Sequence, residues 1–252
     1  MTKNKIVPIL NFITLLIMIG VNIFAMVDLF GSSTKQIADS IPTLLMPSGF
    51  IFSIVWTLIY IGVIIYTIYQ LFSSAAIVDK IGIYFLFSNL FNVLWIIAFH
   101  GKLYMVSMIV IILLNVVLYL ISRRVEDTNN ITKYTFNIYY GWITVAMFVS
   151  IFSFINSIDK GIYNSLVMRI ATAVAIIALM ILAFIKRKNY GFSFTVAFAL
   201  VGVLTKHLID FDAAYPEIII VTIVAILSTL TITILTIGDE SKQEGDVVDE
   251  VL

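Results

Sequence analysis

The chain has 252 residues, of which 61% are hydrophobic and only 12% are charged, and its mean hydropathy is +1.08. Because soluble domains are about 45–50% apolar and about 25% charged, this composition excludes a water-soluble globular protein. The 15 basic and 15 acidic residues give no net charge and do not suggest a nucleic-acid partner. The absence of cysteine excludes disulfides, thiolate metal sites and a cysteine nucleophile.

Eight apolar segments follow one another along the chain, each with at most one charged residue. A helix needs about 20 residues to cross a hydrocarbon core that is about 30 Å thick. We interpret the first segment as a helix and not as a signal peptide, because its apolar run is long and Phe24-Ala25-Met26 is a poor cleavage site. We therefore predict an all-α integral membrane protein with eight transmembrane helices, over residues 6–27, 49–72, 81–99, 103–122, 134–156, 162–185, 190–209 and 216–237.

The distribution of basic residues predicts the orientation of these spans. With the N-terminus in the cytoplasm, ten of the 15 Lys and Arg residues lie in inner segments and three lie in outer loops. The remaining two, Arg169 and Lys206, lie within spans. Because cytoplasmic loops are enriched in Lys and Arg, we expect a protein of the inner (cell) membrane with both termini in the cytoplasm.

The last segment, residues 239–252, contains six acidic residues and one Lys. Such a composition is typical of a solvated, disordered end, and we expect an acidic cytoplasmic tail there. A tail that binds a partner is the alternative interpretation.

Each of the three tryptophans lies in a recognisable motif. Residues 47–60 read PSGFIFSIVWTLIY, which resembles the Pro-Pro-Gly-x-x-Phe-x-x-Val-Trp-x-x-Leu-Tyr signature of the TspO/MBR family, the tryptophan-rich sensory proteins related to the translocator protein. Asn92-x-x-Trp95 is similar to the family's motif in its third helix, and Trp142-x-x-x-Ala146 is similar to the motif in its fifth helix.

The resemblance covers about residues 6–156 and implies a five-helix bundle over residues 1–158, usually dimeric, with a pocket under the loop between the first two spans. Members of the family bind porphyrins, haem and other flat hydrophobic molecules there. A porphyrin or haem is therefore implied as a ligand, and no resident cofactor is assigned. Matched position by position, the pocket residues are Pro47, Trp56, Tyr60, Asn92, Trp95, Trp142 and Ala146.

The chain departs from the family pattern at several positions. Ser48 replaces the second Pro of the signature. Ser88 stands where the third helix of the family has a Gln, and Ser150 stands where the fifth helix has an Asn. Residues 159–238 add three spans, which we expect to form an extension of the five-helix bundle.

The same residues indicate a ligand site without reference to any family. Trp56 and Tyr60 are four residues apart, and Asn92 and Trp95 are three apart, so each pair shares one helix face. An Asn side chain within a span must bond to a neighbouring helix or line a cavity, because hydrocarbon offers no partner. Flat aromatic faces beside an amide suit a planar apolar ligand with a polar edge. Alternatively, Asn92 joins two helices and the aromatic rings simply pack.

Three charged residues form a further candidate site in the later spans. Arg169 lies in the sixth span, and Lys206 and Asp210 lie four residues apart at the end of the seventh. Ionisable groups within spans are functional candidates, so these residues define an intramembrane polar cluster. Structural pairing, with long side chains that reach the membrane surface, is the alternative.

No phosphate-binding glycine loop, Gly-x-Ser-x-Gly motif or His-Glu-x-x-His motif occurs in the sequence, and we expect neither an enzyme nor a metal site. The leading hypothesis is a multi-pass membrane protein that binds a planar hydrophobic small molecule, such as a porphyrin, haem or lipid-like compound, for sensing or transport. The alternatives are a transporter or permease component that uses the charged cluster, and a membrane scaffold subunit without a small-molecule ligand. Expected partners are the lipid bilayer, the small molecule and a second copy of the chain, with no nucleic acid.

Overall fold

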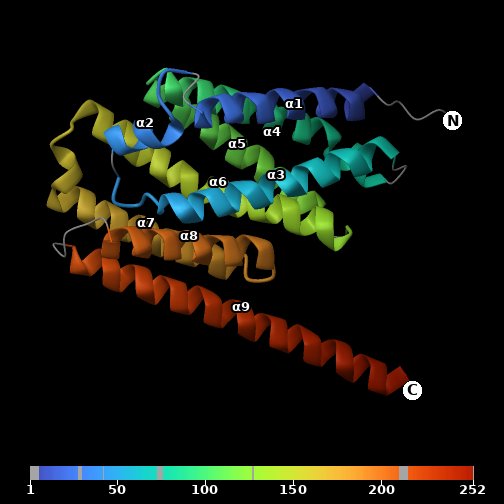
Figure 1. The fold of residues 1–252 in the computed structure, drawn as a ribbon. Coiled ribbons are helices and arrows are strands. Elements are labelled where there is room, and N and C mark those ends of the chain that lie inside the picture. Colours follow the sequence, from blue (N-terminus) through green and yellow to red (C-terminus); the bar gives the residue numbers. More distant parts are fainter. Residues whose placement is uncertain are drawn as a thin grey trace.

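The computed structural model describes residues 6–27, 30–41, 43–72, 76–126, 128–209 and 215–251. Within these ranges the chain is helical and contains no β-strand (Figure 1). The elements are α1 (Ile6–Met26), α2 (Thr34–Ser40), α3 (Gly49–Phe72), α4 (Ala76–His100), α5 (Tyr104–Arg124), α6 (Asn130–Ile158), the 3₁₀ helix η1 (Ile162–Asn164), α7 (Leu166–Ile185), α8 (Tyr190–Ile209) and α9 (Pro216–Val251).

Eight of these helices, all except α2 and η1, are long and apolar enough to cross a membrane. The predicted all-α architecture with eight spans is therefore confirmed, and the chain is a multi-pass membrane protein. Among the last three spans, the start of the sixth differs most from the sequence prediction, and the difference has a local cause. α7 begins at Leu166 and not at residue 162, because the side chain of Ser165 accepts a hydrogen bond from the backbone N–H of Met168 at 3.1 Å and caps the helix.

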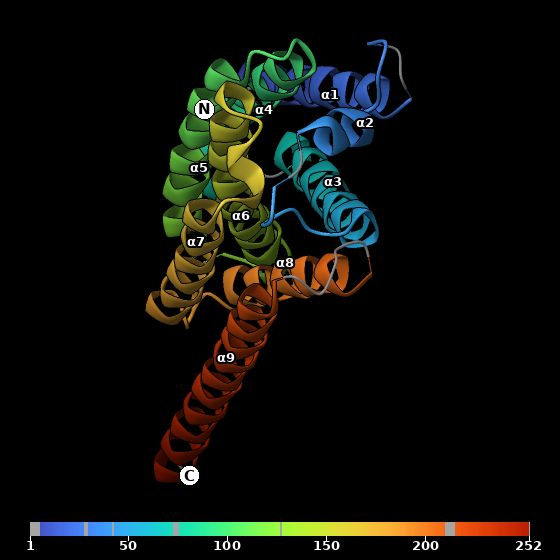
Figure 2. The same ribbon diagram turned by 90° about the vertical axis from the view of Figure 1, so that its left-hand side faces the viewer.

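The first five spans form a closed ring in the spatial order α1, α3, α6, α5 and α4, with α4 packed against α1 (Figure 2). The interior of the ring is filled by large side chains from several helices. Tyr66 of α3, Phe85 of α4 and Phe136 of α6 meet edge to face, with ring centroids 5.0–5.5 Å apart. This aromatic core holds α3, α4 and α6 together near the end of the ring opposite α2.

The connection between α1 and α3 contains the short helix α2, where the sequence analysis expects only a loop. The side chain of Ser33 accepts a hydrogen bond from the backbone N–H of Gln36, and the Gln36 side chain accepts one from the backbone N–H of Ser33 at 2.8 Å. The pattern Ser-x-x-Gln in the sequence is typical of such a reciprocal capping box at the start of a helix. α2 lies at one end of the ring, which we call the α2 end (Figure 1).

The three added helices pack onto one side of the ring. α8 lies against α6 and α3, and α9 lies against α7 and α8 on the far side from the ring (Figure 2). Two glycines bring α6 and α8 close together. A Cβ atom at Gly141 would lie 2.9 Å from the carbonyl oxygen of Phe192, and one at Gly191 would lie 2.9 Å from Cβ of Asn137. Small residues at such contacts allow two helix backbones to approach closely within a membrane.

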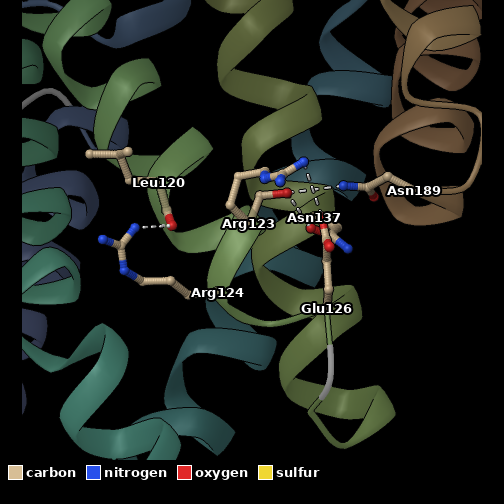
Figure 3. Close-up of polar contacts among 7 residues, drawn as sticks. Leu120, Arg123, Arg124, Glu126, Asn137 and Asn189 are labelled. Atoms are coloured by element: carbon tan, nitrogen blue, oxygen red, sulfur yellow. Dashed lines mark hydrogen bonds and ion pairs between the residues drawn. The ribbon is translucent and has the colours of Figure 1, made fainter.

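Polar side chains tie the extension to the ring at the end opposite α2 (Figure 3). The Ser122 hydroxyl of α5 donates to Oδ1 of Asn137 at 2.8 Å and accepts from Nδ2 of Asn189 at 3.0 Å. Oδ1 of Asn189 accepts the backbone N–H of Phe192 at 3.0 Å and caps α8. Nearby, Arg124 donates to the carbonyl oxygen of Leu120 at 2.8 Å.

α9 continues as a helix to Val251, whereas the composition of residues 239–252 predicts a disordered tail. The difference has a physical cause. Nucleation is the costly step of helix formation, and the membrane span preceding the tail supplies the nucleus. Three Glu, one Lys and one Gln follow residue 239 and are good helix formers, so the helix propagates beyond the apolar segment.

Candidate ligand-binding site

Trp56 of α3 lies at the centre of an aromatic cluster inside the ring. Its indole stacks on Tyr60 with centroids 5.4 Å apart and on Trp95 of α4 with centroids 6.1 Å apart. Two residues of α6 meet it edge to face, Tyr139 at 6.1 Å and Trp142 at 6.4 Å. The three tryptophans of the sequence motifs, which come from three helices, therefore form a single cluster.

Two small cavities share Trp56 and Trp95 as walls. The first has a volume of about 50 Å³ and lies next to α2, and the second has a volume of about 110 Å³. The walls of the first cavity include Thr34, Ala38, Met46, Pro47, Phe52, Trp56, Trp95, Phe99, Trp142, Val145, Ala146, Val149, Ser150 and Ser153. The second cavity is lined by Asn22, Met26, Thr34, Phe52, Ser53, Trp56, Thr57, Tyr60, Trp95 and Ile96. Six of the seven predicted pocket residues thus line one cavity or the other.

Two indole N–H groups at the first cavity lack a hydrogen-bond partner among the described residues. They belong to Trp95 and Trp142, whose side chains are buried. Buried polar groups in proteins nearly always have a partner, so each exception needs an explanation. Ser150, one of the departures from the family pattern, lines this cavity as well. An acceptor on a bound molecule would satisfy either indole.

Asn92, the seventh predicted pocket residue, lines neither cavity. Its side chain is fully buried and joins three helices. Its Oδ1 accepts from Nδ2 of Asn22 on α1 at 2.7 Å, and its Nδ2 donates to the hydroxyl oxygen of Tyr139 on α6 at 3.0 Å. The structure therefore favours the alternative interpretation, in which Asn92 connects α4 to neighbouring helices.

The segment that leads into α3 is held by the extension. The backbone N–H of Ser48 donates to the carbonyl oxygen of Gly202 on α8 at 2.9 Å. Nε2 of His207 on α8 lies 2.7 Å from the carbonyl oxygen of Leu44. Because a carbonyl oxygen only accepts, Nε2 carries the proton in this bond. The departure from the family pattern at Ser48 makes this bond possible, because a proline at this position has no N–H to donate.

Both histidines of the chain therefore contact the segment that covers the cavities. Nε2 of His100, at the end of α4, lies 3.0 Å from the hydroxyl oxygen of Thr34 on α2. Within the described ranges, no three His, Asp or Glu side chains come together as a metal site would require.

The predicted intramembrane polar cluster has a different arrangement. Arg169 of α7 forms an ion pair with Glu217 of α9, and its guanidinium group lies 5.3 Å from the centre of the Tyr215 ring. Lys206 lies on α8, and Asp210 lies outside the described residues. The sequence analysis missed Glu217. The signal for this pair was a single Arg in the sixth span and a single Glu in the eighth, both near the same predicted membrane face.

Comparison with known proteins agrees with these observations. A family model described as TSPO-like protein matches residues 8–237. This match extends past the five spans that carry the tryptophan motifs and includes α7, α8 and most of the apolar part of α9. Neither the curated proteins nor the solved structures provide a match. Because the family model spans most of the chain, the protein belongs to the family of TSPO-like proteins.

Proposed function

We propose that this protein binds a planar, largely apolar small molecule between the tryptophans of the ring, and that it acts in sensing or transport of that molecule and catalyses no reaction. One observation carries the proposal. Trp56 stacks on both Tyr60 and Trp95, while the indole N–H groups of Trp95 and Trp142, which line the adjoining cavity, have no partner within the part of the chain that the structure describes. Flat aromatic walls with two donors suit a flat ligand whose edge carries acceptors, such as a porphyrin, haem or a lipid-like molecule.

The size of the cavities adds a requirement to this proposal. Sites for small molecules usually enclose about 300–1,000 Å³, whereas these cavities have about 50 and 110 Å³. A porphyrin therefore enters only if the cover moves or if Trp56, the shared wall, changes its rotamer. The covering segment, with α2 and residues 43–48, is joined to the helices by side-chain and backbone hydrogen bonds that can break and re-form.

The test is a titration of the detergent-purified chain with protoporphyrin, with haem and with a sterol, followed by tryptophan fluorescence and thermal unfolding. A ligand that binds only the folded state raises the melting temperature by mass action. We expect saturable quenching together with a higher melting temperature for at least one planar compound. If none of these compounds produces either effect, the proposal is wrong.

A matched pair of variants locates the ligand. Trp142→Phe keeps an aromatic wall and removes one N–H donor, so it should weaken binding several-fold. Tyr140→Phe is the control, because Tyr140 lies on the same helix but packs against Phe192 with ring centroids 4.8 Å apart and lines neither cavity. Equal affinities in the two variants would place the ligand elsewhere.

A further inference from the structure

A separate polar pocket lies at the α2 end of the molecule. It has a volume of about 380 Å³ and lies where the end of α2, the turn between α4 and α5, the end of α6 and η1 come together. Figure 2 views the molecule from this end. Its polar walls come mainly from Lys102, Tyr104, Asn156, Lys160 and Tyr163. The pocket shares no lining residue with the two cavities among the tryptophans.

Two lysines converge on this pocket although they lie far apart in the sequence. Lys102 lies in the turn between α4 and α5, and Lys160 follows the end of α6. The orientation predicted from sequence leaves only three basic residues in outer loops, and these two are among them. Both side chains belong to exposed residues, and among the described side chains no carboxylate lines the pocket. The carboxylate of Asp159, next to Lys160, accepts the backbone N–H of Gly161 at 2.9 Å.

The backbone at Lys102 is held by the turn that ends α4. Lys102 has a φ of 57°, in the left-handed region. Its backbone N–H donates to the carbonyl oxygen of Phe99 at 3.0 Å, and that of Leu103 donates to Ala98 at 2.9 Å, so the turn fixes this conformation. Glycine adopts it without a steric penalty, whereas a lysine there is uncommon. The turn that ends α4 therefore fixes where Lys102 stands beside the pocket.

Two tyrosine hydroxyls add neutral donors to the lysine charges. Tyr104 begins α5, and Tyr163 lies in η1, and both line the pocket. The Tyr104 hydroxyl hydrogen-bonds with the Ser40 side chain in the same wall, so it donates to an anion by turning away from Ser40. Burial, together with the neighbouring Tyr215, raises the pKa of Tyr163 to about 12, so its hydroxyl stays protonated at neutral pH and can donate. Two cations and two hydroxyl donors around one space match the needs of a phosphate or carboxylate group.

We propose that this pocket is an anion site that binds a phosphate or carboxylate group between Lys102 and Lys160, with the hydroxyls of Tyr104 and Tyr163 as further donors. The pocket lies at the ends of membrane-spanning helices, so the anion has two sources. It belongs either to the headgroup of an acidic phospholipid in the nearer leaflet or to a soluble compound that carries phosphate.

The first experiment titrates the purified full-length chain with inorganic phosphate at low ionic strength, followed by phosphorus NMR. We expect saturable binding that weakens as salt is added, and that falls about tenfold or more in the double variant Lys102→Gln, Lys160→Gln. The control is Lys80→Gln, which removes one lysine charge from an exposed residue near the start of α4, outside the pocket lining. Since both pocket lysines belong to exposed residues, the variants should fold, and thermal unfolding verifies this.

The second experiment distinguishes the two sources. The chain is reconstituted in phosphatidylcholine nanodiscs with and without phosphatidylglycerol, and retained lipid is measured by native mass spectrometry. Selective retention of phosphatidylglycerol, lost in the double variant but kept in Lys80→Gln, identifies a lipid headgroup. Phosphate binding without such retention identifies a soluble anion. If the double variant retains the wild-type behaviour in both experiments, or the wild-type chain binds neither probe, the proposal is overturned.

Discussion

The backbone N–H of Ser48 donates a hydrogen bond to the carbonyl oxygen of Gly202 over 2.9 Å. This bond joins the segment that enters α3 to α8, a helix outside the five-helix ring. In the signature of the TspO/MBR family this position is a proline, which has no N–H. Any residue other than proline at this position supplies the backbone donor that joins this segment to α8.

The first prediction concerns this bond. Ser48→Pro removes the donor and leaves the carbonyl oxygen of Gly202 without it, which should lower the free energy of unfolding by about 0.5–1.5 kcal/mol. Ser48→Ala keeps the backbone donor and removes only a hydroxyl that has no partner among the described residues, so it should have little effect. Thermal unfolding in one detergent compares the two variants, and equal melting temperatures would show that the bond contributes nothing.

The second prediction concerns the fit of α8 against α3. A Cβ atom at Gly202 would lie 2.9 Å from Cβ of Pro47 and 2.9 Å from Cγ2 of Ile51. Gly202→Ala should therefore push α8 away and destabilise the fold by about 1–3 kcal/mol. Gly238 of α9 has nothing within 4 Å of such an atom, so Gly238→Ala should be neutral or slightly stabilising. Chemical unfolding curves for the pair measure the difference.

The third prediction concerns Asn92. Asn92→Leu removes the bonds to the Tyr139 hydroxyl and to the Asn22 amide, which keeps its bond to the Met18 carbonyl oxygen. The loss should cost about 0.6–1.7 kcal/mol, from the average to the largest value for a hydrogen bond between membrane helices. Ser88→Ala is the control one turn away, because among the described residues that hydroxyl bonds only to the carbonyl oxygen of Phe85 in its own helix. A variant of Asn92 that keeps full stability but loses ligand binding would instead return this residue to the site.

The fourth prediction concerns the ion pair between α7 and α9. A double-mutant cycle with Arg169→Gln and Glu217→Gln should give a coupling of about 0.2–1 kcal/mol, because both side chains are about one-third exposed. The same cycle on Arg123 and Glu126, which are more exposed and 3.8 Å apart, should give no measurable coupling. If the Arg169 cycle also gives none, the two helices are not joined by this pair.

The fifth prediction concerns orientation, which the absence of natural cysteine makes simple to measure. Leu103→Cys and Lys188→Cys each place a single thiol in an exposed turn at opposite ends of the spans. The excess of basic residues at one end predicts that a membrane-impermeant maleimide labels intact cells at position 103. Position 188 should react only after the cells are made permeable, and the reverse pattern would invert the predicted topology.

Hydropathy and motif spacing predicted the spans and the family, because these depend on the chain's local composition. The family resemblance predicted that Trp56, Trp95 and Trp142 lie close together. The sequence did not predict the order of helices in the ring, the bond from Ser48 to α8 or the pairing of Arg169 with Glu217. A lipid-facing and a protein-facing apolar side chain read alike in sequence, so hydropathy does not identify which helices are neighbours.

The position of α8 has a consequence for self-association. Because α8 packs against α6 and against part of α3, the contacting faces of these two helices are closed to a second copy. The opposite side, made by α1, α4 and α5, exposes large apolar residues such as Leu16, Phe87 and Leu113. A second copy can therefore meet the ring only on surface that α8 leaves open, which is on α1, α4, α5 and the exposed face of α3 that carries Leu58 and Ile61.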